Sequence, residues 1–263
     1  MERFELAEAL VRQAGAALRQ ARLEADSVRC KSGHQDLVTV WDRKTEQFLR
    51  KGILEHFPAD AIVGEEYPTE GTASQEAVWY IDPIDGTTNF INQHRNYAVS
   101  VGCWRQGKPL FGLVLDVEED RLYHARAGQG AWCNERRLAA SRRRNIEELL
   151  LFTPDVLRTF LQPAPGGEDL LRLARDVRAV RSIGSVALEL CAVAGGEADL
   201  CVATRSCPWD HNAARIILQE AGGVIAALDG GPLPLNEPGT VLAAGSPEAL
   251  DLVLKRYGGH ENE

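Results

Sequence analysis

The sequence predicts an α+β protein in which layers of helices and sheets are stacked on one another. Two observations support this fold class. Residues 1–140 read as helices followed by antiparallel strands, whereas residues 145–260 alternate between helical and strand-like segments. Neither an internal repeat nor a low-complexity linker separates the two halves. We therefore expect residues 1–263 to fold as a single domain, which is long enough to bury a sizeable core.

The first half opens with an amphipathic helix and continues into strands. Apolar residues recur at helical spacing over residues 3–23. A second helix is expected over residues 42–56, with Asp42 as its N-cap and Pro58 beyond its end. Three strand-like runs separated by polar turns predict an antiparallel meander over residues 97–133. The apolar stripe of the first helix consists of Phe4, Leu6, Ala7, Leu10, Val11, Ala14 and Leu18.

The second half alternates between helices and strands. Helices are expected near residues 154–161, between the PAPGGE loop and VRAVRSIG, over residues 184–196 and 210–223, and from Pro247 onward. The loop PAPGGE at residues 163–168 is the best candidate for a flexible insertion. Strands are expected at LLLF, ADLCVA, VIAAL and TVLAAG.

The composition narrows the classes of function. The chain has 29 Lys and Arg residues against 38 Asp and Glu residues, a net charge of −9, so it is a poor candidate for non-specific nucleic-acid binding. No apolar run approaches the ~20 residues that cross a bilayer, and the N-terminus does not resemble a signal peptide. Six scattered cysteines without a CxxC pair indicate a reducing compartment, so we expect the protein in the cytoplasm.

The segment from Trp79 to Phe90, WYIDPIDGTTNF, carries the strongest chemical signal. An apolar strand delivers Asp82 to its end, Pro83 restricts the turn, and Asp85 can return toward the same point. Two carboxylates held this close repel each other unless a proton or a cation lies between them. Because oxygen ligands favour Mg²⁺, Mn²⁺ or Ca²⁺ over zinc, the pattern predicts a divalent cation site.

The next residues, 86–89, have the sequence Gly-Thr-Thr-Asn. They supply a small residue, hydroxyl groups and backbone N–H groups at a place where a helical turn can start, which is an anion-binding arrangement. Metal ligands beside an anion site suit phosphoryl transfer. The alternative is a plain turn in which Asp82 acts as a cap and Asp85 faces solvent.

Two other acidic segments can complete such a site. Glu65 and Glu66 follow Gly64 at another strand end, although a GEE triplet alone indicates little. Asp210 opens the predicted helix over residues 210–223. It is either only the N-cap of that helix or a further carboxylate of the site.

Taken in order, GEE, DPIDGTTNF and WD…EAGG resemble the signature of the inositol monophosphatase family over almost the whole chain. The resemblance implies a layered αβαβα sandwich of the sugar-phosphatase type, a lithium-sensitive and Mg²⁺-dependent phosphomonoesterase activity, and a homodimer. Further matches are Lys31-Ser32 and Asp36-Leu37-Val38-Thr39…Asp42 before the acidic motifs, and Arg181-Ser182-Ile183-Gly184-Ser185 after them.

The same resemblance implies two or three Mg²⁺ ions in each site, which Mn²⁺ can replace. Glu65, Asp82 and the backbone carbonyl of Ile84 would hold the first ion. Asp82, Asp85 and Asp210 would hold the second, and a third, weaker ion would also lean on Glu65.

The catalytic residues that the resemblance implies are Thr87, Asp42 and Glu65. Thr87, hydrogen-bonded to Asp42, would polarise a water molecule beside the first metal for in-line attack, and no phosphoenzyme is implied. The backbone at residues 86–87 would hold the phosphate, and residues 184–186 would face the alcohol portion. The implied substrate-binding set is Glu65, Ile84, Asp85, Gly86, Thr87, Gly184, Ser185, Val186 and Asp210.

One departure concerns the substrate. Relatives that prefer inositol phosphates have a glutamate seven residues before the WD aspartate, where this chain has Ala203 with Arg205 beside it. A site without that acceptor should discriminate less among polyol phosphates, and Arg205 could favour a bisphosphate. His211, next to Asp210, is expected on the helix surface or behind the ligands rather than as a ligand itself.

The leading hypothesis is therefore a Mg²⁺-dependent phosphomonoesterase that hydrolyses inositol 1-phosphate or related polyol and sugar phosphates. The alternatives within the enzyme class are histidinol-phosphate phosphatase, fructose-1,6-bisphosphatase and a 3′-phosphoadenosine-type nucleotidase. The alternative from another class is a non-catalytic interaction protein.

Overall fold

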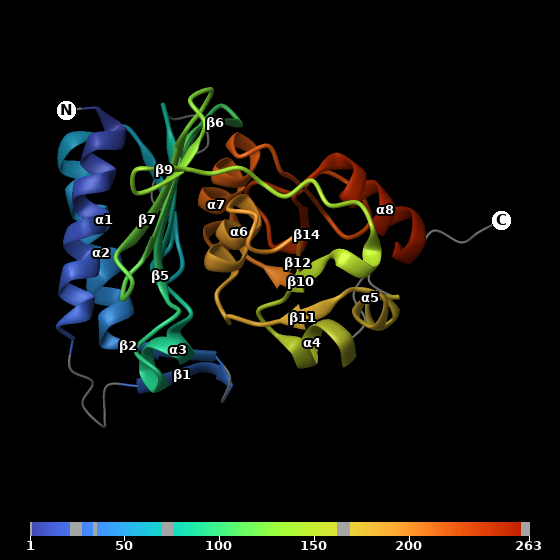
Figure 1. The fold of residues 1–263 in the computed structure, drawn as a ribbon. Helices are drawn as coiled ribbons and strands as arrows, with labels where there is room; N and C mark the ends of the chain where they lie inside the picture. Colours follow the sequence, from blue (N-terminus) through green and yellow to red (C-terminus); the bar gives the residue numbers. More distant parts are fainter. Residues whose placement is uncertain (1, 22–27, 34–35, 70–75, 162–168, 259–263) are drawn as a thin grey trace.

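The computed structural model describes residues 2–21, 28–33, 36–69, 76–161 and 169–258. In these residues, helices and sheets alternate in five layers (Figure 1). The order is a pair of helices, a larger sheet, a second pair of helices, a smaller sheet and an outer group of helices. The predicted α+β class with stacked layers is confirmed. The PAPGGE loop lies outside the described residues.

The first layer consists of α1 (Arg3–Arg19) and α2 (Val40–His56). Every residue of the predicted apolar stripe of α1 is buried, although the helix ends earlier than expected. The predicted N-cap of α2 is wrong. Thr39 caps this helix, because its Oγ1 accepts a hydrogen bond from the backbone N–H of Trp41. Asp42 is the third residue of the helix and accepts in return from the N–H of Thr39, which completes a capping box.

The larger sheet contains, in spatial order, β3 (Ala61–Gly64), β4 (Val78–Asp85), β5 (Ala98–Arg105), β6 (Lys108–Asp116), β7 (Arg121–Arg126), β8 (Ala131–Cys133) and β9 (Arg136–Arg137). β3 and β4 run parallel, and each later pair is antiparallel. The meander predicted over residues 97–133 is therefore confirmed. The short strands β8 and β9 extend it to the edge of the sheet.

The smaller sheet contains, in spatial order, β11 (Ala179–Arg181), β10 (Leu150–Phe152), β12 (Leu200–Ser206), β14 (Gly239–Ala244) and β13 (Val224–Ala226). β10 pairs in parallel with both β11 and β12, whereas β14 is antiparallel to its two neighbours. The larger and the smaller sheet therefore each contain both parallel and antiparallel strand pairs.

Two helices, α6 (Val186–Ala194) and α7 (Pro208–Glu220), lie between the sheets. All nine residues of α6 are buried, and eight of them are apolar, the exception being Glu189. The other helices of the second half, within the described residues, are α4 (Val156–Leu161), α5 (Leu170–Asp176), α8 (Pro247–Tyr257) and a 3₁₀ turn at Ile146–Glu148.

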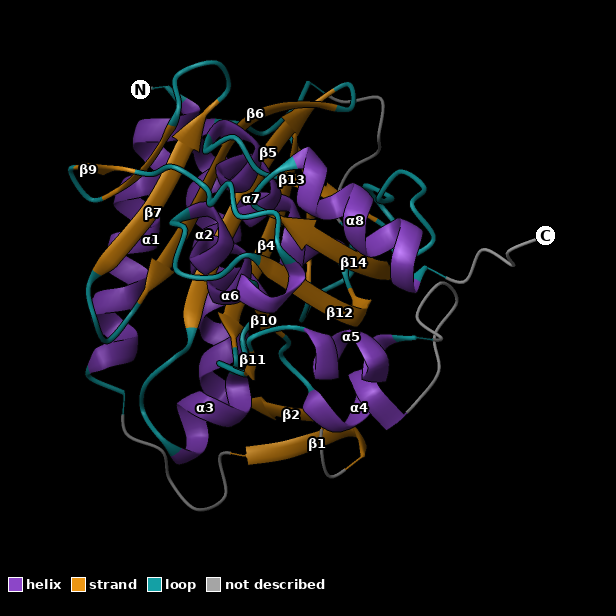
Figure 2. Cartoon of the chain, turned by 45° about the vertical axis from the view of Figure 1, so that its right-hand side comes forward, coloured by secondary structure: helices purple, strands orange, loops and turns teal. Residues whose placement is uncertain are grey.

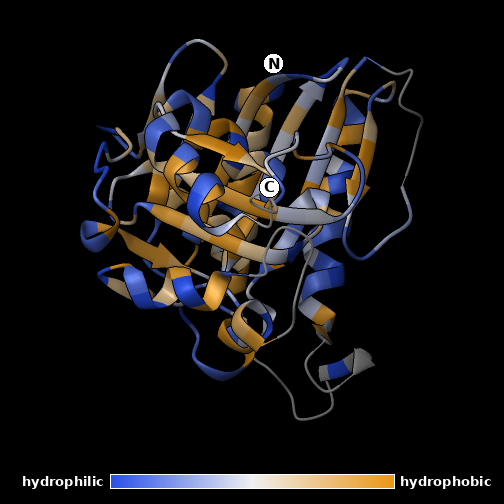
Figure 3. Cartoon of the chain, turned by 90° about the vertical axis from the view of Figure 1, so that its right-hand side faces the viewer, coloured by the Kyte–Doolittle hydropathy of each residue, from blue (hydrophilic) through white to orange (hydrophobic). Residues whose placement is uncertain are grey.

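Three clusters of apolar side chains fill the spaces between the layers. One packs α1 and α2 against the larger sheet, one joins both sheets to α6 and α7, and one packs the smaller sheet against α5 and α8. Figure 3 shows apolar residues along the strands and hydrophilic residues in many loops. Within the described residues, the structure contains no helix with the length and apolar character needed to cross a membrane.

A separate two-stranded ribbon leads into α2. β1 (Val28–Gly33) pairs antiparallel with β2 (Asp36–Thr39), and the sequence did not predict either strand. β2 packs beside α3 (Thr87–Asn92), which follows β4 directly (Figure 2). The ribbon therefore places the start of α2 next to the end of β4.

Candidate active site

Two strand ends and three helix N-termini meet in one place. Because β3 and β4 are parallel neighbours, the residues after Gly64 lie at the same edge of the sheet as the end of β4. The N-terminus of α6 contacts this edge at Asp85, and the N-terminus of α2 contacts it at Thr87. The first turn of α7 brings Asp210 near enough to Asp82 for its charge to raise the pKa of Asp82.

Asp85, the last residue of β4, is held by the N-terminus of α6. Its Oδ2 accepts hydrogen bonds from Ser185 Oγ and from the backbone N–H of Ala187, both at 2.6 Å. Ser185 is also the N-cap of α6 and accepts from the N–H of Leu188. Burial raises the pKa of Asp85 to about 6, and the hydrogen bonds to its charged form oppose that rise.

Asp82 and Asp210 each use one carboxylate oxygen to hold nearby backbone. Asp82 Oδ1 accepts from the N–H of Ile84 at 3.0 Å, and Asp210 Oδ2 accepts from the N–H of Cys207 at 2.7 Å. Burial raises the pKa of Asp82, and the negative charges of its neighbours, Glu65 foremost, raise it further. The pKa of Asp210 is also raised, first by burial and then by neighbouring carboxylates.

The chemistry of the four carboxylates of Glu65, Asp82, Asp85 and Asp210 fits a divalent cation. In the part of the chain that the structure describes, no Lys, Arg or His forms an ion pair with Asp82, Asp85 or Asp210. Among the same residues, no three His, Cys, Asp or Glu side chains are already arranged around one point as a metal site. The donors are hard oxygens whose mutual repulsion Mg²⁺ would remove, and Glu65 would add a further oxygen ligand.

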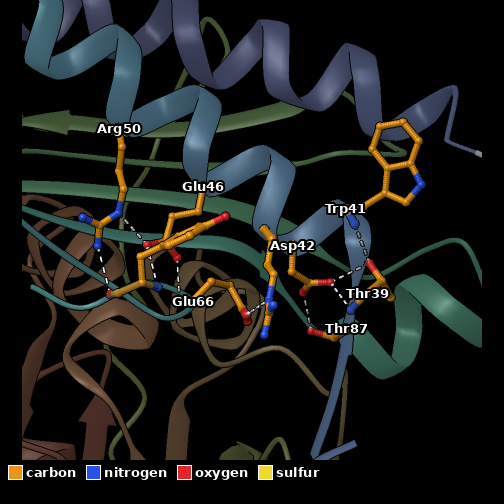
Figure 4. Close-up of polar contacts among 9 residues, drawn as sticks. Thr39, Trp41, Asp42, Glu46, Arg50, Glu66 and Thr87 are labelled. Atoms are coloured by element: carbon orange, nitrogen blue, oxygen red, sulfur yellow. Dashed lines mark hydrogen bonds and ion pairs between the residues drawn. The ribbon is translucent and has the colours of Figure 1, made fainter. Parts of the chain in front are cut away.

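Thr87 lies between Asp42 and the end of β4 (Figure 4). Its Oγ1 is 3.1 Å from Asp42 Oδ1 and 3.1 Å from the backbone carbonyl oxygen of Ile84. The other oxygen of Asp42, Oδ2, accepts hydrogen bonds from the N–H and the hydroxyl of Thr39. Burial raises the pKa of Asp42, and these hydrogen bonds offset part of the rise. The Thr87 oxygen is therefore held within hydrogen-bonding distance of two acceptors.

Gly86 links β4 to α3 with a φ of 94°, in the left-handed region that glycine adopts without strain. A Cβ at this position would lie 3.3 Å from the carbonyl oxygen of Gly184, so the two segments are in contact. Asn89 Nδ2 fixes this contact by donating to the carbonyls of Asn96 and Ile183, both at 2.8 Å. The segment expected to hold phosphate therefore touches the segment expected to face the alcohol.

Glu189 is a buried carboxylate that the sequence analysis missed. It lies on α6, where its Oε1 accepts from the backbone N–H of Ile183 at 2.7 Å and of Gly184 at 3.2 Å. Burial raises its pKa to about 8. Val186, the first residue of the same helix, is buried. A single Glu within the apolar run VALELCAVA is the sequence signal that could have found Glu189.

Glu46 and Arg50 are two further charged residues that the sequence analysis missed. They follow Asp42 on α2 at successive four-residue steps, on the face that points toward the site (Figure 4). Arg50 Nε donates to Glu46 Oε1 at 2.7 Å, and both side chains are buried. Glu46 Oε2 accepts from the backbone N–H of Glu66 at 2.7 Å. The i, i+4, i+8 spacing of charged residues was the available signal.

His211, next to Asp210, was expected either on the helix surface or behind the ligands. It is fully buried, with its Nδ1 2.9 Å from Ser206 Oγ, so the surface alternative is wrong. Burial lowers the pKa of His211 to about 4, so the imidazole is neutral at pH 7. Ala203 is buried in β12 within the cluster that includes α6 and α7, and Arg205 is exposed.

Comparisons with known proteins cover almost the whole chain. The model of the inositol monophosphatase family matches residues 2–258. The chain is 40% identical over 254 residues to the Inositol-1-monophosphatase of Bacillus subtilis (strain 168), covering 96% of this chain and 95% of that protein. Crystal structures of SaIMPase-II with inositol monophosphate bound and with 2′AMP bound give TM-scores of 0.85 and 0.84, at 30% and 32% identity. They cover 98% and 97% of this chain and 93% and 92% of those chains.

The layered fold and these full-length matches define the chain as a phosphoric monoester hydrolase. It belongs to the inositol monophosphatase family, whose members depend on Mg²⁺. The resemblance found in the sequence is therefore confirmed.

Proposed function

We propose that this enzyme hydrolyses inositol 1-phosphate or a related polyol or sugar phosphate. The observation that carries the proposal is the Thr87–Asp42 hydrogen bond at the edge of the larger sheet where the charges of Glu65, Asp85 and Asp210 act on the buried Asp82. The name of the Bacillus subtilis relative and the inositol monophosphate bound to SaIMPase-II support this substrate class.

The proposed cation sites use the residues that this edge brings together. Glu65, Asp82 and the carbonyl of Ile84 would hold one Mg²⁺, and Asp82, Asp85 and Asp210 a second, with a weaker third ion also at Glu65. Mn²⁺ would occupy the same sites. When bound, Mg²⁺ neutralises the charge of the phosphate and makes water a stronger acid.

Side chains of the protein orient the attacking water and accept its proton. The Thr87 hydroxyl has one proton to donate, to Asp42 or to the carbonyl of Ile84, and its lone pairs can then accept a proton from the attacking water. A raised pKa makes Asp42 a better proton acceptor within this pair. Glu65, just beyond the end of the parallel neighbouring strand β3, would be a further base, and no side chain forms a bond to phosphorus.

The substrate is proposed to bind at two segments that contact each other, residues 86–87 and residues 184–186. The backbone N–H groups of Gly86 and Thr87 would bind phosphate oxygens at the start of α3, where the helix also favours negative charge. Gly184, Ser185 and Val186, at the start of α6, would face the alcohol portion. Their place is set by the hydrogen bonds of Asp85 and Glu189 described above.

A phosphate-release screen tests the proposal. It compares inositol 1-phosphate with histidinol phosphate, fructose 1,6-bisphosphate, 3′-phosphoadenosine compounds and 2′-AMP, each with and without Mg²⁺. The 2′AMP bound to SaIMPase-II makes the nucleotide arm of the screen the principal alternative. We expect the highest kcat/KM with inositol 1-phosphate or another polyol phosphate.

The Asp85→Asn variant separates catalysis from a non-catalytic interaction role. We expect it to keep the fold and to lose Mg²⁺-dependent turnover. If the wild-type protein releases no phosphate above the metal-free rate from any of these compounds, the proposed substrates are wrong.

A homodimer is proposed as the assembly. Four apolar side chains are exposed on the neighbouring helices α4 and α5, where a second copy could cover them. They are Val156, Leu157, Leu161 and Leu171.

The proposed compartment is the cytoplasm. Support comes from the cysteine side chains that the structure describes: five are free thiols, and four of these are buried. Burial raises the pKa of Cys191 and Cys201, which keeps these side chains as unreactive thiols in the core.

A further inference from the structure

We infer that Glu46, together with Arg50, is a positioning residue that sets the place of Glu65. The inference rests on the proposed function for the role of Glu65 as a metal ligand. Glu46 does not belong to the four-carboxylate cluster. It acts through the backbone on either side of Glu65, and α2 thereby reaches the site at two places, at Thr87 through Asp42 and at the backbone of Glu66 through Glu46 (Figure 4).

Glu46 holds the chain immediately after Glu65. Its Oε2 accepts from the N–H of Glu66 at 2.7 Å, and its Oε1 accepts from the N–H of Tyr67 at 3.3 Å. Arg50 donates through Nε to Glu46 Oε1 at 2.7 Å and through Nη2 to the carbonyl of Tyr67 at 3.1 Å. The backbone of Tyr67 is therefore held at both its N–H and its carbonyl.

Glu46 also contacts the chain immediately before Glu65. A Cβ at Gly64, the last residue of β3, would lie 2.2 Å from Glu46 Oε1, so only glycine lets the carboxylate come this close. One side chain thus touches the residues on both sides of Glu65. The direction in which Glu65 leaves the end of β3 is fixed by these contacts.

Packing alone does not explain this pair. Glu46 is 0% exposed and Arg50 is 7% exposed. A buried ion pair is often no more stabilising than apolar residues of the same size, because both charges lose their hydration. What apolar residues cannot supply is the acceptor that the N–H groups of Glu66 and Tyr67 find in the Glu46 carboxylate. The carboxylate is therefore required for the shape of this loop.

The Glu46→Gln variant tests the inference. Arg50 Nε and the N–H groups of Glu66 and Tyr67 all donate to the carboxylate, so the NH₂ group of a glutamine must face one of these donors and displace the loop. We expect the dissociation constant for Mn²⁺, titrated into the metal-free full-length protein and followed by electron paramagnetic resonance, to rise by about tenfold. The Mg²⁺ concentration for half-maximal phosphate release should rise in parallel, with the KM for substrate at saturating Mg²⁺ unchanged.

Arg50→Lys is the second variant, and it decides the question if Glu46→Gln does not fold. It keeps the positive charge beside Glu46 but loses the second donor, which reaches the carbonyl of Tyr67. We expect a smaller rise in the Mn²⁺ dissociation constant, in the same direction.

The matched control is Asp60→Asn. Asp60 is a buried carboxylate paired with Arg3 at 2.7 Å, and it precedes β3 at the end opposite to Glu65. The control should lower the melting temperature but leave Mn²⁺ affinity unchanged. The inference is overturned if folded Glu46→Gln and Arg50→Lys keep wild-type Mn²⁺ affinity, or if Asp60→Asn weakens Mn²⁺ binding as much as they do.

The proposed function can fail separately from this inference. A wild-type protein that binds Mn²⁺ but hydrolyses none of the phosphate esters would refute the proposed function alone, and the Mn²⁺ affinities would still decide the role of Glu46. A folded wild-type protein that binds no Mn²⁺ would refute both.

Discussion

Thr87 has two acceptors, Asp42 and the carbonyl of Ile84, for one hydroxyl proton. Replacing it by valine keeps the shape and removes the hydroxyl. In steady-state kinetics we expect Thr87→Val to lower kcat by on the order of 10²-fold or more, as for the loss of a general acid–base group. Mn²⁺ affinity should change little, and Thr87→Ser should recover most of the rate. Wild-type kcat in Thr87→Val would remove Thr87 from the chemistry.

Glu189 gives the protein a predictable dependence of stability on pH. Its pKa is about 8 in the folded protein against an ordinary 4.5, so between these values the native state binds more protons than the unfolded chain. The stabilisation from Glu189 is therefore complete below pH 4.5 and is lost as the pH rises through about 8. Without metal, the melting temperature of the wild type minus that of Glu189→Gln should fall over this range. A melting-temperature difference that does not change with pH would contradict the raised pKa of Glu189.

At the level of elements, the capping box of α2 couples helix stability to the site. Thr39→Ala removes the acceptor for the N–H of Trp41 and a donor to Asp42. We expect about 1 kcal/mol of lost stability in urea unfolding, together with a lower kcat. Ser246→Ala, at the N-cap of α8, removes an equivalent cap on a different helix and should leave kcat unchanged. Equal kcat values in the two variants would show that the cap of α2 has no role in the reaction.

The sequence predicted best those elements in which the hydrophobic pattern repeats several times. The stripe of α1 and the three meander strands repeat often enough to define helix or strand. β8 and β9 are too short for a period of two to be visible. The cap of α2 was misassigned because Thr and Asp both cap helices, and the choice of Thr39 depends on the reciprocal bond from Asp42.

At the level of the whole molecule, the apolar patch on α4 and α5 argues for association with a second copy. Leu157 and Leu161 are 64% and 68% exposed. We expect wild-type protein to run as a dimer in light scattering coupled to size exclusion, and Leu157→Glu to run as a monomer. Phe48→Glu, on α2 in the opposite outer layer, is the matched control and should remain dimeric. A monomeric wild type at micromolar concentration would refute the dimer.

The acidic motifs of the site are visible in the sequence, whereas their supports are not. DPID and GEE stand at strand ends, so their proximity follows once β3 and β4 are parallel neighbours. The roles of Glu46 and Glu189 depend on how α2 and α6 pack against loops that are distant in sequence from them. No local pattern specifies that packing, so only the folded chain shows which buried carboxylate holds which loop.

The most direct test of the account is diffraction from crystals grown with Mn²⁺, recorded at the manganese absorption edge. The account predicts one anomalous peak within bonding distance of Glu65, Asp82 and the carbonyl of Ile84, and a second within bonding distance of Asp82, Asp85 and Asp210. Well-ordered carboxylates with no anomalous peak among them, at saturating Mn²⁺, would contradict it.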